Sequence, residues 1–112
     1  MDDISTFEKL AALLLNKATE KKAHAVLLDK NGDAKSILLK YHIDGNWVEE
    51  DDPPPKFLWP NLRNVYLLLA GVDYWKKGAF SGIIRKDFII QEWYLKVSES
   101  HDVLEFIHKE EN

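Results

Sequence analysis

AHAVLLDKNGDAKSILLKYHI, residues 23–43, decides the fold, because it holds two extended apolar segments joined by a turn. Residues 23–29 are followed by Asn31-Gly32-Asp33 and then by residues 35–43. Asn-Gly supplies the positive φ angles that tight hairpin turns demand. The stretch therefore predicts an antiparallel β-hairpin.

The second segment of this hairpin has one apolar and one mixed face, because side chains on a strand alternate between faces. One face carries Ile37, Leu39, Tyr41 and Ile43. The other carries Leu38, Lys40, His42 and Asp44. We expect the first set to face the core and the second to face away from it.

Two amphipathic helices are predicted, one before the hairpin and one after it. Helical spacing in the first, over about residues 5–21, is seen at Phe7, Leu10, Leu13, Leu14 and Ala18. Pro60 suits the first turn of the second helix, and Gly71 closes it. Its helical spacing is seen at Leu62, Val65, Tyr66, Leu69 and Ala70.

The remaining segments complete a predicted α+β domain over residues 1–112. Trp47-Val48, the acidic residues 49–52 and Pro53-Pro54-Pro55 are read as an ordered, extended crossover. Residues 79–85 and 88–97 are read as strands, and residues 103–107 as a last strand or helical turn. The expected order is α-β-β-α-β-β-(β), with two main helices packed on an antiparallel sheet.

Composition narrows the class of partner and the location. The formal net charge is −4 and there is no cysteine, so nucleic acid is an unfavourable partner and thiolate chemistry is excluded. The acidic residues 49–52 suit either a docking patch for a basic protein or a solvated loop. The acidic start and the short apolar stretch at residues 10–15 predict no signal peptide and no membrane insertion, so we expect a cytoplasmic protein.

No catalytic motif is visible in the sequence. The phosphate-binding loop GxxxxGK[ST], the dinucleotide fingerprint GxGxxG and the hydrolase elbow GxSxG are all absent, and Ser81 lacks the flanking glycine that the elbow needs. We expect no enzyme activity, no cofactor and no catalytic residue.

Histidine and aspartate side chains offer one weak candidate for metal binding or base catalysis. His42 and Asp44 share a strand face, which suits two metal ligands or a base with its orienting carboxylate. A metal needs three or four convergent ligands, and His24 belongs to the core-facing row with Val26 and Leu28. We therefore expect no metal site, and we read His101 and His108 as surface residues.

Aromatic residues are frequent enough to predict an interface beyond the core. The set comprises Trp47, Phe57, Trp59, Tyr66, Tyr74, Trp75, Trp93 and Tyr94. Trp93 and Tyr94 are adjacent on a strand and face opposite ways, as Tyr74 and Trp75 do if their segment is extended. We expect Trp75, Trp93 and Tyr94 to include residues that contact a partner.

Three stretches resemble the second N-terminal domain of the ATPases that drive type II secretion and type IV pilus assembly in bacteria. They are residues 38–45 (LLKYHIDG), 53–58 (PPPKFL) and 69–73 (LAGVD). That family shows a strand ending Arg-x-Arg-Ile-Asp-Gly, a proline-rich crossover and a helix ending Ala-Gly-Leu-Asp. The likeness spans about residues 8–108, includes Leu95-Lys96-Val97-Ser98 at the family's Arg-Val-Ser strand, and implies a PAS-like sheet.

The departures from the family concern its nucleotide contacts. The family's strand arginines correspond here to Lys40 and His42, and the arginine of its Arg-Val-Ser strand corresponds to Lys96. The family's Ala-Ser-Asp-Ile-His stretch is Ala23-His24-Ala25-Val26-Leu27 here, and its Pro-Gln-Asp-Gly-Arg segment is replaced. An arginine fork holds phosphate in a way that lysine and histidine do not reproduce, so we expect these positions to be degenerate.

Two main functions remain open from the sequence, beside a residual one, a weak hydrolase or metal protein built around His42 and Asp44. The first is a non-enzymatic interaction or regulatory module that lacks the motor domain and binds a secretion or pilus ATPase, or another copy of itself. The second is a PAS-like sensor that encloses a small ligand between its sheet and its helices.

Overall fold

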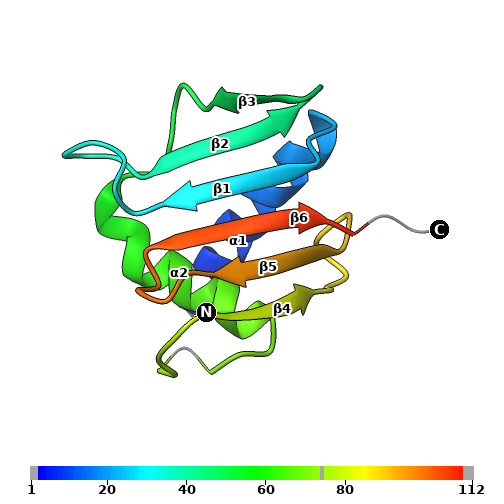
Figure 1. The fold of residues 1–112 in the computed structure, drawn as a ribbon. Coiled ribbons are helices and arrows are strands. Elements are labelled where there is room, and N and C mark those ends of the chain that lie inside the picture. Colours follow the sequence, from blue (N-terminus) through cyan, green and yellow to red (C-terminus); the bar gives the residue numbers. More distant parts are fainter. Residues whose placement is uncertain (1–2, 74, 110–112) are drawn as a thin grey trace.

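The structure is a computed structural model that describes residues 3–73 and 75–109. Its elements follow in the order α1 (Asp3–Glu20), β1 (Ala25–Asp29), β2 (Leu38–Ile43), β3 (Asn46–Glu49), the 3-10 helix η1 (Lys56–Leu58), α2 (Trp59–Leu69), β4 (Phe80–Ile84), β5 (Trp93–Val97) and β6 (Val103–His108). The strands form one six-stranded antiparallel sheet in the order β3-β2-β1-β6-β5-β4 (Figure 1). The expected α+β class, with helices packed on a sheet, is confirmed.

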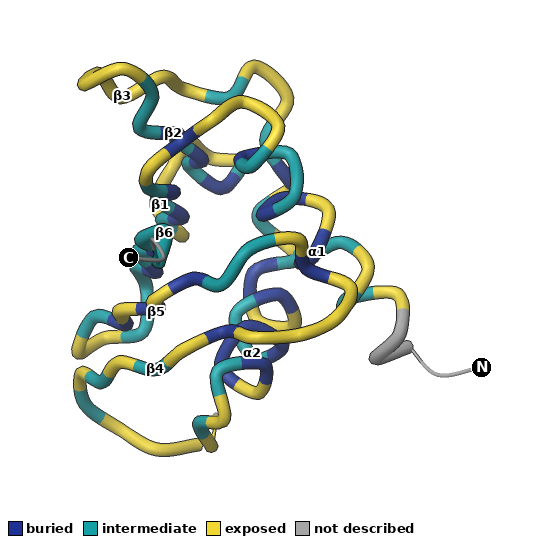
Figure 2. Tube along the Cα trace, turned by 90° about the vertical axis from the view of Figure 1, so that its right-hand side faces the viewer, coloured by how far each residue is buried: buried dark blue, intermediate teal, exposed yellow. Residues whose placement is uncertain are grey.

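The two helices cover one face of the sheet and leave the other open. Figure 1 looks onto the sheet with α1 and α2 behind it, and Figure 2, turned by 90°, separates the sheet from the helical layer. No described helix lies on the front of the sheet in Figure 1. The fold therefore has two layers, and every strand presents one row of side chains to the helices and the other row to the open face.

The core lies between the sheet and the helices. Leu39 and Tyr41 of β2, and Ile37 just before it, are each 1% exposed, while Ile43 packs against the core from its edge, so the predicted core face is confirmed. Leu13 is 61% exposed, and its place in the predicted buried stripe of α1 is wrong. At about 100° per residue, Leu13 lies on nearly the opposite side of the helix from Ala11 and Leu15, which are both fully buried.

The connection between β1 and β2 differs from the predicted tight turn. Neither Asn31 nor Gly32 has a positive φ. Instead, the Oδ1 atom of Asp33 accepts hydrogen bonds from the backbone N–H groups of Lys35 and Ser36, both at 2.7 Å. Gly32 serves a close approach, since a Cβ atom at that position would lie 2.5 Å from the Ser36 carbonyl oxygen. The two strands are antiparallel as predicted, but the type of turn was predicted wrongly.

Strand β3 is missing from the order predicted from the sequence. It pairs with β2 from Lys40↔Glu49 to Ile43↔Asn46. The turn before it uses positive φ angles at Asp44 (51°) and Gly45 (81°). All four residues of β3 are exposed, so the strand shows none of the buried alternation by which strands are recognised.

The proline segment after β3 is the ordered crossover that was predicted. The carbonyl of Pro54 accepts a hydrogen bond from the N–H group of Ile37 at 3.0 Å, and Pro55 forms an isolated bridge with Ser36. The two hydrogen bonds that flank this bridge use the Pro54 carbonyl and the N–H group of Lys56, which bonds to the Lys35 carbonyl at 2.8 Å, so no proline N–H group is needed.

Residues 88–97 do not form one long strand, as was predicted, because only Trp93–Val97 belongs to the sheet. The preceding residues leave the sheet and pack against α1. Asn16 donates from Nδ2 to the Phe88 carbonyl at 3.1 Å and accepts at Oδ1 from the Ile90 N–H at 2.8 Å. Ile89 between them is 5% exposed. This contact with a distant helix overrides the local preference for a strand.

Tyr41 and Tyr66 form a matched pair of buried phenols. Tyr66 donates its hydroxyl hydrogen bond to the Ala11 carbonyl at 2.8 Å, whereas no described group partners the hydroxyl of Tyr41. Burial, together with the nearby charge of Glu50, raises the pKa of Tyr41 to about 12. Burial also raises the pKa of Tyr66 well above its ordinary value.

Tyr41→Phe is expected to leave the stability at pH 7 unchanged or slightly higher, because it removes a buried hydroxyl that has no protein partner. Tyr66→Phe is expected to cost about 1 kcal/mol, because it removes a hydrogen bond. Urea unfolding of both variants measures this difference. A loss in Tyr41→Phe as large as that in Tyr66→Phe would contradict the assignment.

The same Tyr41→Phe variant has an expected signature at high pH. The folded pKa of Tyr41, about 12, lies above the unfolded value of 10.0, so its contribution to stability is present below pH 10 and is lost as the pH rises toward 12. The full shift corresponds to about 3 kcal/mol. Unfolding measured from pH 9 to 12 should therefore show a smaller loss of stability in Tyr41→Phe than in the wild type.

Candidate functional site

One row of side chains crosses the whole open face of the sheet. The strand registers place its members opposite one another in the order Trp47, His42, Ala25, Ile107, Tyr94 and Ile83. Side chains directly opposite each other on neighbouring strands lie about 4.5–5.5 Å apart at Cβ. Trp47 is 44% exposed, Tyr94 41% and Ile83 38%. We call this the aromatic row, and it provides a strip of mainly apolar side chains, interrupted by His42, on a face that no described helix covers.

A second row, parallel to the first, is mostly charged. It runs across the six strands in the order Glu49, Lys40, Leu27, Glu105, Lys96 and Ser81. Lys40 lies opposite Glu49, and Lys96 lies opposite Glu105. We call this the charged row. Each lysine has a carboxylate as its cross-strand neighbour, so the row carries little net charge.

The three positions expected to correspond to nucleotide contacts all lie on this face, but they are not close together. Lys40 and Lys96 are in the charged row with β1 and β6 between their strands, which at about 4.8 Å per strand separates them by about 14 Å. His42 lies in the aromatic row. Glu105, beside Lys96, is unfavourable for a phosphate. Both lysines could reach one phosphate group only by lying flat across β1 and β6, so the arrangement is unfavourable for a shared phosphate.

His42 and Asp44 do not share a strand face, although the sequence predicted that they would. β2 ends at Ile43, and Asp44 lies in the turn with a φ of 51°, so the strand alternation does not reach it. The ring of His42 instead contacts Trp47, with centroids 5.0 Å apart. Within residues 3–73 and 75–109, no group of three or more histidine, cysteine or acidic side chains is arranged to hold a metal ion.

His24 is not on the core-facing row to which the sequence assigned it. β1 begins at Ala25, so His24 precedes the strand and its direction does not follow the alternation. Its side chain is exposed, and its ring lies 6.5 Å from the ring of His42. The prediction that the hairpin separates these two histidines is therefore wrong.

The three residues expected at an interface have different environments. Tyr94 lies on the open face, and Trp75 is 65% exposed. Trp93 is fully buried and has no surface to offer a partner, because the alternation that turns Tyr94 outward turns Trp93 into the core. Tyr74, which was considered with them, lies outside the described residues.

The two C-terminal histidines lie at the surface, as predicted, but they are half-buried and each ring is packed against a neighbouring ring. His101 shares a hydrogen bond between its Nε2 atom and the Gly78 carbonyl at 2.9 Å. Its ring also lies 5.1 Å from that of Phe80. The ring of His108 lies 5.6 Å from that of Trp93. Both rings pack where strand ends and loops close over the sheet, which a local sequence pattern does not reveal.

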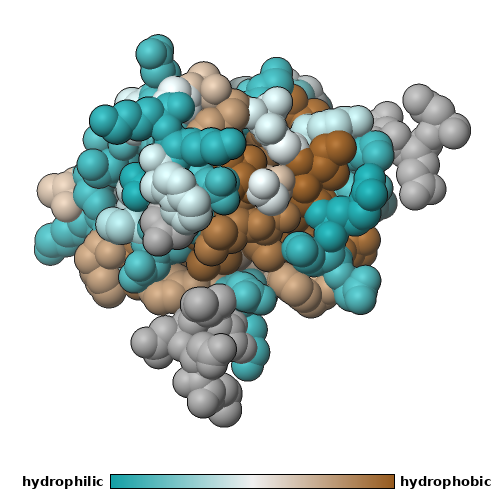
Figure 3. Space-filling view, turned by 90° about the horizontal axis from the view of Figure 1, so that it is seen from below, coloured by the Kyte–Doolittle hydropathy of each residue, from teal (hydrophilic) through white to brown (hydrophobic). Residues whose placement is uncertain are grey.

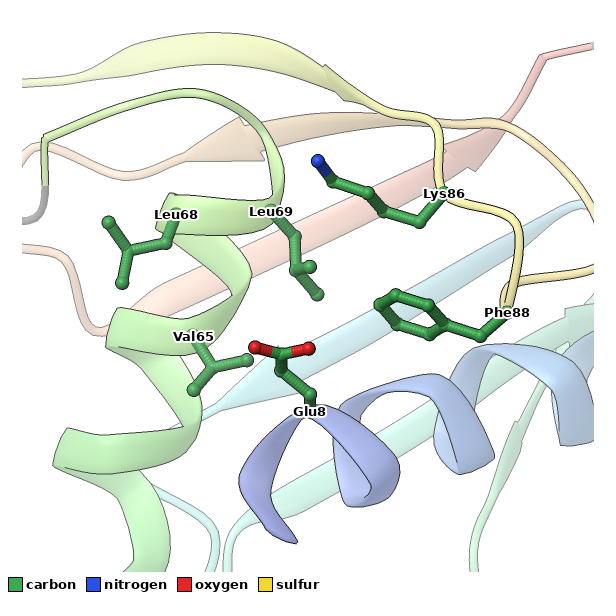
Figure 4. A pocket seen from close by; sticks show the side chains of 6 residues that line it. All are labelled: Glu8, Val65, Leu68, Leu69, Lys86 and Phe88. Atoms are coloured by element: carbon green, nitrogen blue, oxygen red, sulfur yellow. The ribbon is translucent and has the colours of Figure 1, made fainter. Parts of the chain in front are cut away.

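A shallow hollow lies on the helical side of the molecule, away from the open face. It has a volume of about 240 Å³ and is lined by Glu8, Val65, Leu68, Leu69, Lys86 and Phe88 (Figure 4). Figure 4 shows Glu8 of α1 pointing up between Val65 of α2 and Phe88 of the β4–β5 connection. The hollow is formed between the helices and this connection, so it is not the space between sheet and helices that a PAS-like ligand site would use.

Apolar surface is also exposed on the β4 side of the molecule. Figure 3 views this side and shows a hydrophobic area bordered by hydrophilic surface. The elements at this end contribute exposed apolar side chains from α2, β4 and the β4–β5 connection, namely Leu68, Ile83 and Phe88. Ile83 is also the last member of the aromatic row, so apolar surface reaches the edge of the sheet.

Sequence reasoning missed several members of these rows. Ile83, Glu105 and Ile107 alternate with buried neighbours, and that alternation was a usable signal. The neighbours of each strand could not be read from it, because strand order depends on contacts between distant segments.

Comparisons with known proteins identify no family. No family model matches the sequence, and no curated protein matches it. None of the helices formed by the described residues is both long enough and apolar enough to cross a membrane. The function must therefore be sought in the surface of the chain itself.

Proposed function

We propose that this chain is a non-catalytic module that binds another protein through the open face of its sheet. The observation that carries the proposal is the aromatic row, with Trp47, Tyr94 and Ile83 exposed by 44%, 41% and 38%. Small-molecule sites are concave, whereas aromatic side chains on an open surface are typical of protein interfaces. A strip that crosses a sheet from edge to edge suits a partner of comparable size.

The charged row supports the same proposal. Lysines and carboxylates alternate along it, so a partner with complementary alternation would be selected over one of uniform charge. The spacing of Lys40 from Lys96, and the carboxylate of Glu105 beside Lys96, disfavour a phosphate ligand. These features favour recognition of a protein over nucleotide turnover.

A relation to the secretion and pilus ATPases is part of the proposal. It rests on the resemblance of residues 38–45, 53–58 and 69–73, two of which end in turns with a positive φ angle. The Ile-Asp-Gly stretch forms a turn with positive φ at Asp44 and Gly45, and the Ala-Gly stretch ends α2 with a φ of 75° at Gly71. On this view the partner on the open face is an ATPase of that class. A cytoplasmic location, expected from the sequence, belongs to the same proposal.

Tyr94→Ser is expected to weaken binding of the partner about 30-fold, the effect of losing about 2 kcal/mol at an interface hot spot. Leu13→Ser is the matched control, because Leu13 is also exposed but lies on α1, on the opposite side. Affinity capture with the wild type and both variants would identify proteins that the wild type and Leu13→Ser retain and that Tyr94→Ser loses. Titration of the purified partner would then give the affinities.

Three results would contradict this function. The first is a captured protein that is lost equally from both variants, since that would place the contact elsewhere. The second is ATP hydrolysis by the purified chain. The third is a small molecule that stays bound in native mass spectra, which would favour a PAS-like sensor that encloses a small ligand.

A further inference from the structure

The two edge strands of the sheet have flanks of opposite charge. β3 and β4 lie at opposite ends of the sheet, at the top and bottom of Figure 1. Residues 44–52, around β3, contain five acidic residues and no basic one. Residues 76–86, around β4, contain four basic residues, Lys76, Lys77, Arg85 and Lys86, and no acidic one. Lys17 engages Glu50 and Arg85 engages Glu92, so the remaining flanking charges face solvent or neighbouring loops.

The backbone of β3 directs hydrogen-bonding groups away from the sheet at two residues. The N–H group of Glu50 bonds to the Leu39 carbonyl at 2.9 Å, so residues 46, 48 and 50 face β2. By alternation, Trp47 and Glu49 direct both their N–H and C=O groups outward. No other described residue forms a hydrogen bond with these outward groups.

The backbone of β4 has the same property at its outer edge. The N–H group of Ser98 bonds to the Val103 carbonyl at 3.0 Å, so residues 94, 96 and 98 face β6, and residues 93, 95 and 97 face β4. Residues 80, 82 and 84 of β4 pair with them, so the N–H and C=O groups of these three residues point toward β5. Ser81 and Ile83 therefore direct their N–H and C=O groups outward.

Strand directions allow the two edges of separate copies to meet. Six strands alternate in direction across the sheet, so β3 and β4 run in opposite directions. A second copy that is shifted along the sheet, without being turned over, places its β3 antiparallel to the β4 of the first. The outward residues Trp47, Glu49, Ser81 and Ile83 all have their side chains on the open face, so the two edges also match in pleat.

We propose that copies of this chain associate head to tail, with the β3 edge of one copy added to the β4 edge of the next. In the matching register, Trp47 lies opposite Ile83 of the next copy, and Glu49 lies opposite Ser81. Both are hydrogen-bonded pairs, so the N–H and C=O groups of both residues in each pair find partners. The exposed rings and methyl groups of Trp47 and Ile83 become cross-strand neighbours.

Charge selects this partner edge over the alternatives. In the antiparallel register Asp51 and Asp52 extend toward Lys76 and Lys77, and Asp44 lies near Lys86, while Glu50 and Arg85 keep their partners within the chain. Pairing two β3 edges would instead oppose two acidic flanks, and pairing two β4 edges would oppose two basic flanks. The contact joins two different edges, so a dimer keeps one free edge of each kind. Assembly therefore continues beyond a dimer unless a ring closes. Only two residues on each edge bond outward, so the association is weak and reversible.

This association goes beyond the proposed function, since it uses the sheet edges and not the open face. Copies related by a shift keep the same face outward, so the aromatic row of one copy continues into that of the next at Ile83 and Trp47. An extended partner would then meet several open faces at once, which raises the apparent affinity without new contacts.

Charge-reversal variants of the full chain test the proposal in sedimentation experiments. The first variant carries Asp51→Lys and Asp52→Lys, and the second carries Lys76→Glu and Lys77→Glu. We expect the wild type to form species larger than a dimer at low salt, and each variant alone to associate at least about tenfold more weakly. An equimolar mixture should restore association, because the altered β3 flank of the first variant is complementary to the altered β4 flank of the second, and the two unaltered flanks are complementary as in the wild type.

A backbone variant separates strand pairing from general charge attraction. Ser81→Pro removes an N–H group that points outward and leaves the bonds from β4 to β5 intact. It should abolish association while circular dichroism shows an unchanged fold. Tyr94→Ser, which tests partner binding on the open face, should leave association unchanged, so the two proposals can fail independently.

Several outcomes would overturn the head-to-tail association. They are a wild type that stays monomeric up to about 1 mM at low salt, assembly that stops at dimers, and association that survives both charge reversals. A mixture that fails to restore what each reversal removes would do the same. Raising the salt from about 0.01 M to about 1 M shortens the screening length from about 30 Å to about 3 Å, so association that does not weaken would also count against it.

Discussion

Phe106→Ala is expected to lower the free energy of unfolding by about 3–5 kcal/mol, a large part of the total stability of a small domain. Phe106 is fully buried in β6 between Val26 of β1 and Leu95 of β5. Its ring lies edge-on to that of Tyr66 in α2, with centroids 4.7 Å apart. Removing the ring leaves a cavity at the point where the sheet meets the helices. Urea unfolding followed by circular dichroism measures the loss.

Ile107→Ala is the matched control for this prediction. Ile107 is the next residue in β6, but it faces the open side of the sheet in the aromatic row and is only half-buried. We expect a loss of about 1 kcal/mol, as is usual for a partly exposed site. Equal losses in the two variants would mean that the faces of β6 are not assigned correctly.

Gly32→Ala is expected to cost about 2–3 kcal/mol, because the added methyl group has no room. A Cβ atom at this position would lie 2.5 Å from the Ser36 carbonyl oxygen and 2.6 Å from the Leu38 nitrogen. Both are backbone atoms at the start of β2, so the clash can be relieved only by moving the chain. Asn31→Ala, at the exposed neighbouring position, should change the stability by less than about 0.5 kcal/mol.

Gly32→Asn separates the two reasons for a glycine at this position. A turn with positive φ would tolerate asparagine, which adopts that conformation more readily than other residues. A close approach would not tolerate it, because any Cβ atom meets the same backbone. We expect Gly32→Asn to be at least as destabilising as Gly32→Ala in urea unfolding. Near-wild-type stability of Gly32→Asn would instead support the tight turn with positive φ that the Asn-Gly pair predicts.

Much of the fold could be predicted because the core imposes a pattern on the sequence. The alternation of Leu39 and Tyr41 in β2, and the helical spacing in α1 and α2, follow from burying one face of each element. Strand β3 escaped prediction for the complementary reason, since all of its residues are exposed. The prediction of a strand over residues 88–90 is wrong because Asn16, on a distant helix, binds the backbone of these residues. Their apolar side chains alone would suit a strand.

The candidate site was predictable only in its members and not in its layout. Alternation turned Tyr94 away from the buried Trp93 and placed Lys40 and His42 on the non-core side of their strand. It could not show that β1 and β6 lie between Lys40 and Lys96, or that His24 comes within 6.5 Å of His42. These relations depend on which strands are neighbours.

By itself, the sequence determined the buried face of most elements and where most helices and strands lie, because burial and local propensity act over a few residues. Only the tertiary structure decided the strand order, and with it the aromatic row, the separation of the lysines and the opposite charges at the two edges of the sheet. Pairing between distant strands is set by the collective packing of the core, and short segments do not encode it.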